Sequence, residues 1–378
     1  MITTTASTLL YNSTLTIDDT MEKLNYLKSI YSWLIPLMII ILALAIIGNG
    51  LIVLAAPFLS SPVSPYLKLC ISLAAADMWA ASLLITGLVV NSYLPVVIGV
   101  HKSSKCVDAW LEMFRVSGML TSDMHLFALA INQFFGTLWP LKYKVMVTTR
   151  RIRCIVLSLW IVPLLFVFCW FISGENDGLR HEKCYMFFYN RFPFRITIFL
   201  IFIIPLLATL LIYGTILSKL LKAKAEFEMT ERYASDPPIQ RRNHRKIATF
   251  RCTGTRRSNV HSKLKLVWTT LLIVSTFSLS WGLCVLYFVL VCVDGCPFTY
   301  NVSLNFYLGL FLNSTVNCLV MIKLASNPFI YTLRIRAIKT SVDTLLATLF
   351  HRKTYPTNSA GKATVTLLGN TSGAAVSL

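Results

Sequence analysis

The sequence predicts an all-α membrane protein, a bundle of seven transmembrane helices followed by a short amphipathic helix. Composition supports this prediction, because 56% of the 378 residues are hydrophobic and only 13% are charged, whereas roughly a quarter of the residues in a soluble domain are charged. The chain also contains nearly charge-free runs, each of which reaches the roughly 20 residues that a helix needs to cross the hydrocarbon. These seven runs are residues 32–59, 69–94, 108–141, 154–174, 196–218, 266–293 and 304–333.

The distribution of basic residues predicts the orientation of the helices. The segment 219–265, between the fifth and sixth runs, carries 13 Lys and Arg residues against four acidic residues, and such enrichment is typical of cytoplasmic loops. We therefore expect a multi-pass plasma-membrane protein with an extracellular N-terminus and a cytoplasmic C-terminus. This topology accounts for the net charge of +19, so we expect the lipid bilayer as a partner and no nucleic acid.

The chain is expected to divide into four regions. Residues 1–31 are expected to form a short, disordered extracellular tail, and residues 32–332 the seven-helix bundle. Residues 333–350 place apolar residues at three- and four-residue steps beside Arg and Lys, which predicts an amphipathic helix on the membrane surface. Residues 351–378 are rich in Ser, Thr, Gly and Ala without periodicity, which predicts a disordered cytoplasmic tail that kinases can phosphorylate. Glycosylation acceptors lie on the extracellular side at Asn12 and Asn301.

Four cysteines are expected on the oxidising side of the membrane. Cys106 precedes the third run and Cys184 lies between the fourth and fifth runs, so we expect a disulfide between them. Cys292 and Cys296 flank the outer end of the sixth run, and they form either a second, local disulfide or two free thiols.

Several residues within the runs follow a shared pattern that ends with the segment Asn327 to Tyr331. The other members of the pattern are Gly48, Asn49, the segment Leu73 to Asp77, Trp160, Pro205, Tyr213, Phe277 and Trp281. With these residues in register, the chain from about residue 32 to 350 resembles a rhodopsin-like (class A) G-protein-coupled receptor. The resemblance implies a ligand pocket that opens outward, an inner cleft for a heterotrimeric G protein, and a tail for receptor kinases and arrestin. A tail without a partner is the alternative.

The third run departs from the family pattern. Asn132, Gln133 and Phe134 stand where receptors of this family have Asp-Arg-Tyr. Gln133 retains hydrogen-bonding capacity but loses the charge, and Lys263 stands where an acid would complete the usual charged pair between the third and sixth helices. Without that pair, no ionic lock can form. The resemblance assigns activation and the G-protein cleft to Asn132, Gln133, Phe134, Pro205, Tyr213, Phe277 and Tyr331.

The membrane interior contains three charged residues, Asp77, Asp123 and Lys323, and such residues are functional candidates. The resemblance implies that Asp77 binds a sodium ion with a polar residue at Ser122 and two asparagines of the seventh helix. Lys323 replaces one of these asparagines. We hypothesise that its ammonium pairs with Asp77 in place of sodium; alternatively, it pairs with Asp123 or is neutral because it is buried. The expected polar cluster is Asn49, Asp77, Ser122, Asp123, Lys323 and Asn327.

A lysine in the seventh run also raises the possibility of a retinal protein. The lysine of opsins precedes the Asn of this motif by six residues, but Lys323 precedes Asn327 by four. A two-residue shift turns a helical side chain by about 200°, and the position six residues back is Met321. We therefore expect no cofactor.

The ligand pocket is predicted around Arg115, which lies five turns, about 27 Å, above Gln133 on the third helix. Arg115 would repel a cationic amine unless Glu112 neutralises it through an i,i+3 pair, whereas an acidic lipid or peptide would find a bidentate donor. Alternatively, Arg115 extends outward to the interface. Arg191 and Arg195, at the entry of the fifth run, either add to the pocket or mark the interface. The expected ligand residues are Glu112, Arg115, Trp281, Tyr287 and Phe288.

The sequence thus predicts a receptor that binds an extracellular ligand and signals through heterotrimeric G proteins with atypical coupling. The alternative is a non-signalling scavenger or decoy receptor, or an arrestin-biased receptor, and the missing arginine at Gln133 favours it. No nucleophile–base pair, metal-ligand cluster or phosphate loop is visible in the sequence, so we expect neither an enzyme nor a metal site. Transport is disfavoured because the runs do not form repeated halves with broken helices.

Overall fold

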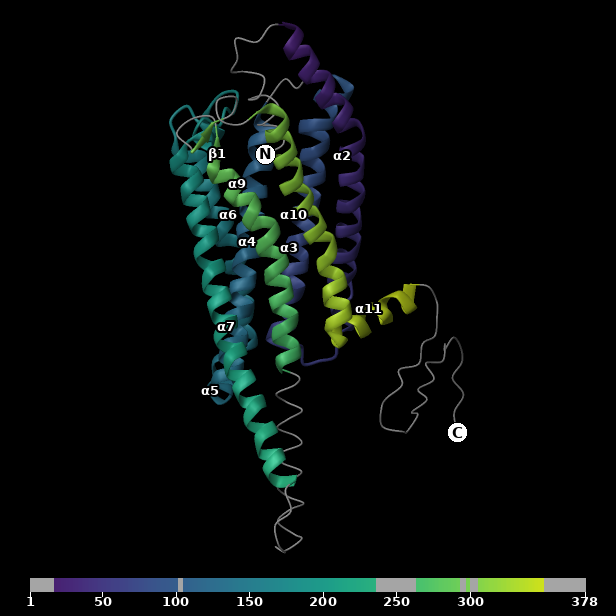
Figure 1. The fold of residues 1–378 in the computed structure, drawn as a ribbon, viewed down its shortest axis with the longest axis vertical. Helices are drawn as coiled ribbons and strands as arrows, with labels where there is room; N and C mark the ends of the chain where they lie inside the picture. The colour runs from purple at the N-terminus through teal and green to yellow at the C-terminus, as the bar shows by residue number, and fades with distance from the viewer. Residues whose placement is uncertain (1–16, 101–104, 236–262, 293–296, 300–304, 350–378) are drawn as a thin grey trace, which may run out of the picture.

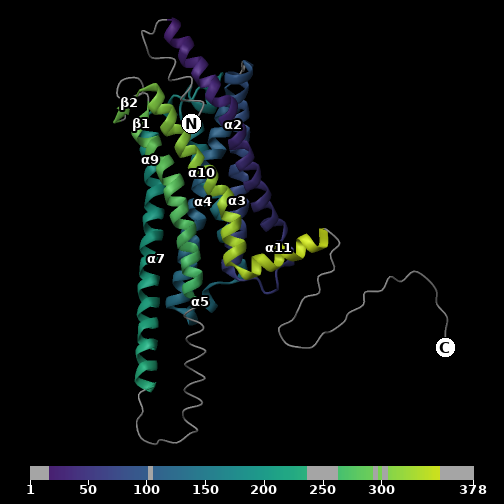
Figure 2. The same ribbon diagram turned by 45° about the vertical axis from the view of Figure 1, so that its right-hand side comes forward.

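The computed structural model describes residues 17–100, 105–235, 263–292, 297–299 and 305–349, and seven long helical segments run side by side in this part of the chain (Figures 1 and 2). They are α2 (Ile17–Leu54), α3 (Pro65–Leu88) continued by the π-helical η2 (Val89–Ile98), α4 (Cys106–Leu138), α6 (Thr149–Ser173), α7 (Phe192–Ser235), a helix over 263–277 continued by the π-helical η5 (Ser278–Gly282) and α9 (Leu283–Leu290), and α10 (Phe306–Arg334). This arrangement confirms the predicted seven-helix bundle.

Short elements connect these helices. On one end lie η1 (Ala56–Phe58) and α5 (Pro140–Met146), and on the other η3 (Gly178–Arg180) and η4 (Phe188–Asn190). The described residues also contain two parallel two-residue strands, β1 (Val291–Cys292) and β2 (Phe298–Thr299), in which Val291 pairs with Phe298. These strands lie at the end of the bundle that carries the predicted extracellular loops (Figure 2).

Six of the seven segments are long and apolar enough to cross a membrane on the basis of length and composition among the described residues. The exception is α4, which carries Glu112, Arg115 and Asp123. Their side chains are largely or fully buried within the protein, because α4 packs against α3, α6 and α7 at the centre of the bundle. Its polar residues are therefore covered by other helices and do not require contact with lipid.

The first helix begins earlier than the sequence predicts. Residues 1–31 are expected to be a disordered tail, but α2 begins at Ile17 and continues without a break into the membrane-spanning part. Leu27 and Tyr31 are each only 2% exposed, so the added turns bury apolar side chains against the bundle. The boundary at residue 31 was wrong because charged residues such as Asp19 and Lys23, which form an i,i+4 ion pair on the helix, interrupt the apolar run.

The amphipathic helix after the seventh span is confirmed as α11 (Arg336–Leu349). It begins directly after α10 and turns away from the bundle axis (Figures 1 and 2). Ile338, Val342 and Leu345 are buried, because α11 packs against α2 and η1. The predicted cytoplasmic tail, 351–378, lies outside the described residues.

A glycine in α2, Gly48, allows this helix to lie close to the seventh span, α10. A Cβ atom at Gly48 would lie 2.8 Å from Cγ of Pro328, which is too close for any residue with a side chain. The neighbouring Asn49 side chain donates to the Leu324 carbonyl of α10 at 3.1 Å. The pair Gly48-Asn49 therefore docks the first helix onto the segment that contains Asn327 and Pro328.

The sixth span is irregular just before and at Gly282. Residues Ser278–Gly282 are π-helical, and a π segment is one of the identifiable causes of helix bending. This irregular turn contains Trp281, which is 2% exposed. Gly282 is the last residue of this irregular turn.

Candidate functional site

A polar cluster lies in the outer part of α4. The guanidinium of Arg115 donates from Nε to Glu112 at 2.9 Å and forms a second bond to the same carboxylate oxygen through Nη2. Nη2 also lies 2.9 Å from the hydroxyl of Tyr189, which in turn donates to Glu112 at 3.0 Å. Burial and the nearby Glu112 carboxylate raise the pKa of the Tyr189 phenol, so this hydroxyl retains its proton and serves as the donor.

The Glu112–Arg115 pair settles one question left open by the sequence. Arg115 does not extend outward to the interface, because its side chain is 15% exposed and is held by the i,i+3 carboxylate. The positive charge of Arg115 and the negative charge of Glu112 cancel. The site is therefore polar without being strongly cationic. Tyr189, which comes from η4 in the loop before α7, covers the pair.

Two cavities adjoin this cluster. The larger has about 430 Å³ of unfilled space including its open mouth, and its polar lining consists of Asn91, Ser92, Glu112, Arg115 and Asn317. The smaller, with about 290 Å³, lies on the other side of Arg115 and is lined mainly by apolar groups that include Phe288. Glu112, Arg115 and Phe288 are therefore brought together at the expected site, while Trp281 and Tyr287 do not line either of these two cavities.

Arg195 has a role that the sequence does not reveal. Its Nη1 atom donates to the carbonyls of Phe288 and Val291, both at 2.6 Å, and its Nε donates to the carbonyl of Tyr189 at 3.1 Å. The guanidinium also lies 4.4 Å from the centroid of the Phe288 ring. Arg195 thus caps the C-terminal end of α9, where helix carbonyls lack partners within the helix, and ties this end to η4.

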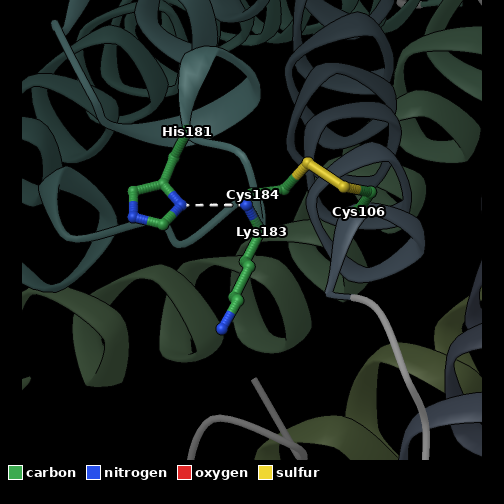
Figure 3. Close-up of a disulfide and its surroundings, with 4 residues drawn as sticks. All are labelled: Cys106, His181, Lys183 and Cys184. Atoms are coloured by element: carbon green, nitrogen blue, oxygen red, sulfur yellow. Dashed lines mark hydrogen bonds between the residues drawn. A yellow bond between two sulfur atoms is a disulfide. The ribbon is translucent and has the colours of Figure 1, made fainter.

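The expected disulfide joins Cys106 at the start of α4 to Cys184 in the loop that follows η3 (Figure 3). Close to it, the Nδ1 atom of His181 accepts a hydrogen bond from the backbone N–H of Lys183 at 3.0 Å. The disulfide therefore anchors the loop that carries Tyr189. The possible Cys292–Cys296 pair and the glycosylation acceptors fall outside the described residues and side chains.

The predicted intramembrane cluster forms around Asp77. Lys323 donates to one of its carboxylate oxygens at 2.8 Å, and Asn327 donates to the other at 2.5 Å. Ser122 lies 3.5 Å from the oxygen that Lys323 contacts. The Lys323 and Asp77 side chains are 2% and 0% exposed, so they form a buried ion pair that links α10 to α3.

Asp123 is separate from this pair. Its side chain is fully buried, and neither of its carboxylate oxygens has a hydrogen-bond partner among the described residues. His125 does not serve it, because the His125 ring nitrogens contact Ser72 at 2.8 Å and the Thr121 carbonyl at 2.8 Å. The choice between Asp77 and Asp123 as the partner of Lys323 is thus resolved in favour of Asp77.

At the end of the bundle that is predicted to be cytoplasmic, a hydrogen-bonded cluster replaces the charged pair. Gln133 of α4 donates to the hydroxyl of Thr270 on the sixth span at 2.7 Å, and the Tyr66 hydroxyl lies 3.2 Å from the same oxygen. Thr270 uses its single proton for the Leu266 carbonyl, so it accepts from both other groups. One hydroxyl therefore joins the second, third and sixth spans.

Two further contacts hold the same region. Asn132 accepts from the Tyr143 hydroxyl of α5 at 2.9 Å, and Lys263 donates to the Gly136 carbonyl at 3.3 Å. Neither contact involves an acidic side chain. In the described part of the chain, the third and sixth spans are therefore joined here by Gln133–Thr270 and Lys263–Gly136 contacts, which involve no carboxylate.

The sequence model described as 7 transmembrane receptor (rhodopsin family) matches residues 48–331. The chain belongs to this family. The match includes all seven spans in whole or in part and every residue of the three clusters described above.

Individual relatives within the rhodopsin family are distant. The alpha-2B adrenergic receptor of Equus caballus is 31% identical over 120 residues, which cover 31% of this chain and 29% of that receptor. The alpha-2B adrenergic receptor of Rattus norvegicus is 32% identical over 120 residues, covering 31% of this chain and 25% of that receptor. The matched stretch is therefore less than a third of the length of these relatives.

In this rhodopsin-family receptor, three residues that the family resemblance assigns to activation are buried in the bundle. Phe277 stacks against Phe202, with ring centroids 5.6 Å apart, and Tyr213 and Tyr331 are completely buried. Their hydroxyl groups have no hydrogen-bond partner among the described residues. Sequence reasoning missed Tyr66, Tyr189 and Thr270, because each acts on a residue of a different span or loop and no local motif marks it. Arg195 was singled out, but its contacts with the carbonyls of the sixth span were not predicted.

Proposed function

We propose that this rhodopsin-family receptor binds an extracellular ligand in the outer half of its bundle and signals through heterotrimeric G proteins. The single observation that carries the proposal is the hydrogen bond from Gln133 to Thr270. It joins the third and sixth spans where the family resemblance places the G-protein cleft. The family match over residues 48–331 supports the same proposal.

The neutral contact at Gln133 gives the coupling its atypical character. A net contribution of about 1 kcal/mol is typical of a neutral hydrogen bond, compared with about 1.5–3 kcal/mol when one partner is charged. The Gln133–Thr270 hydrogen bond can therefore hold the sixth span against the third in the resting state, and breaking it requires little free energy. The side-chain oxygen of Gln133, Oε1, is buried and has no partner among the described residues. Once the sixth span has moved away, the Gln133 amide can therefore both donate a hydrogen bond to a bound G protein and accept one from it.

Removing the Thr270 hydroxyl tests this proposal. We expect Thr270→Val to raise basal G-protein activation by about five-fold, because the loss of about 1 kcal/mol from the resting state shifts the equilibrium by that factor. A biosensor for G-protein dissociation in cells with matched surface levels of receptor measures the effect.

Thr269→Val is the matched control for this prediction. Thr269 is also buried, at 2% exposed, but its hydroxyl donates only to the Lys265 carbonyl of its own helix. We expect this variant to leave basal activation unchanged. Equal effects of the two substitutions would contradict a role for the Gln133–Thr270 contact.

The ligand is proposed to bind beside Arg115. An acidic group on a lipid or peptide would compete with the Tyr189 hydroxyl for the guanidinium, to which carboxylates bind strongly. The distant relatives are adrenergic receptors, but we do not transfer their ligand class to this chain. The reason is that the Glu112 carboxylate in the outer part of α4 is already paired with Arg115, so it is not free to pair with a cationic amine.

The remaining features of the proposal follow the predicted topology. The N-terminus is extracellular, the C-terminus is cytoplasmic, and receptor kinases and arrestin act on the C-terminal tail. The uncharged amide of Gln133 also favours a second candidate function, a decoy or arrestin-biased receptor that binds ligand without activating a G protein. Activation of a G protein by the unmodified chain distinguishes the two candidates.

A further inference from the structure

Both carboxylate oxygens of the buried Asp77 are contacted by groups of the chain itself. One carboxylate oxygen accepts from the Lys323 ammonium at 2.8 Å, with the Ser122 hydroxyl at 3.5 Å, and the other accepts from the Asn327 amide at 2.5 Å. The ammonium also lies 5.1 Å from the centroid of the Phe277 ring. The described contacts of this carboxylate therefore come from α4 and α10, and its cation also touches the sixth span.

The family resemblance implies a sodium ion at Asp77, but these residues do not fit one. Lys323 supplies a positive charge and no oxygen ligand, and its ammonium already occupies the position next to the carboxylate. A second cation at this site would lie close to the ammonium in a medium of low dielectric constant, where like charges repel strongly. The Asp77–Lys323 pair is already neutral, so the site provides no net attraction for sodium.

We infer that Lys323 is a resident cation that takes the place of the exchangeable sodium ion, so that the stability of this receptor does not depend on sodium. A bound ion can leave the site, whereas the ammonium remains attached to α10 and can move only with that helix. Because it contacts both Asp77 and the Phe277 ring, it couples α3 directly to the aromatic residues of the sixth span. This inference concerns ion binding and does not depend on the identity of the ligand or the G protein.

The chain offers a way to restore the sodium site. Lys323→Asn removes the ammonium and supplies an amide oxygen, while Asp77, Ser122 and Asn327 remain in place. We expect the Tm of the purified variant to be at least about 2 °C higher in NaCl than in KCl at equal ionic strength, because an ion that binds only the folded state stabilises it. The wild-type protein should have the same Tm in both salts.

Two controls locate the effect. The double variant Asp77→Asn/Lys323→Asn lacks the carboxylate and should lose the difference between the two salts. Asp123→Asn in the Lys323→Asn background should keep it, because Asp123 does not contact Lys323 or Asp77 among the described hydrogen bonds. A sodium effect that disappears with Asp123→Asn instead would place the ion at the other carboxylate and overturn the inference.

The wild-type comparison remains decisive even if Lys323→Asn does not fold. A Tm that rises specifically with NaCl in the wild-type protein would overturn the inference, because it would show that sodium binds while the ammonium is present. A folded Lys323→Asn variant with equal Tm in NaCl and KCl would also count against it. In that case the site would not bind sodium even without the ammonium, so Lys323 could not be a replacement for a sodium ion.

Discussion

Lys323→Met is expected to destabilise the folded receptor by about 3–5 kcal/mol, the range typical of removing one partner from a buried ion pair. The substitution leaves the Asp77 carboxylate 0% exposed and without a cation, with only the Asn327 amide and the more distant Ser122 hydroxyl as partners. A loss of this size corresponds to a decrease in Tm on the order of 10 °C. Thermal unfolding of the purified receptor in KCl measures it without interference from sodium.

Two comparisons make the Lys323 prediction specific. Lys222→Met removes an exposed lysine from α7 and should leave Tm nearly unchanged. Asp77→Asn/Lys323→Met removes both charges and should recover most of the loss, because no unpaired buried charge remains. A Lys323→Met variant as stable as Lys222→Met would contradict the buried pair.

Arg195→Ala is expected to destabilise the receptor by at least about 3 kcal/mol at the end predicted to be extracellular, because it leaves two buried carbonyls of the sixth span without their charged donor. The substitution also removes the contacts of Arg195 with the Tyr189 carbonyl and the Asn190 side chain, both at 3.1 Å. We expect a lower surface level of the receptor and a lower Tm. Quantitative cell-surface labelling and thermal unfolding measure these effects.

Arg191→Ala is the matched control, since Arg191 lies one helical turn before Arg195 and is exposed. It should leave both quantities nearly unchanged. Arg195→Lys should recover only part of the loss, because one ammonium cannot reproduce the fork of donors that contacts α9 and η4 together. Equal stability of the Arg191 and Arg195 variants would show that the contacts of Arg195 contribute little.

Much of the fold could be predicted from the sequence because lipid imposes a simple rule. An apolar run long enough to cross the hydrocarbon has to be helical, so the spans and the amphipathic α11 were recognisable. The start of α2 at Ile17 was not, because its first turns carry Asp19 and Lys23. Hydropathy identifies the part of a helix that lies in lipid and does not identify an extension beyond it.

The functional clusters were only partly predictable for a different reason. The pairs Glu112–Arg115 and Lys323–Asp77 could be proposed because charged residues inside a membrane need partners. Thr270 is 137 residues from Gln133, and a threonine on a membrane helix usually bonds to its own backbone. Its role in joining spans becomes visible only when the helices are packed together.

The three clusters share one physical feature, which is that each consists of uncharged groups or of an ion pair whose charges cancel. Gln133 stands in place of an arginine, Lys323 is proposed to take the place of a mobile cation, and Glu112 neutralises Arg115. We therefore expect a receptor whose conformational switch operates through hydrogen bonds and a lysine ammonium fixed to α10.

Basal G-protein activation by the wild-type chain and by Gln133→Arg, measured with a panel of biosensors at matched surface levels, tests the central claim most directly. We expect the wild type to activate at least one class of G protein above the level of cells without the receptor, because the amide of Gln133 suffices for coupling. A signal confined to the Gln133→Arg variant would contradict this account, since it would show that the natural glutamine prevents coupling in an otherwise competent receptor.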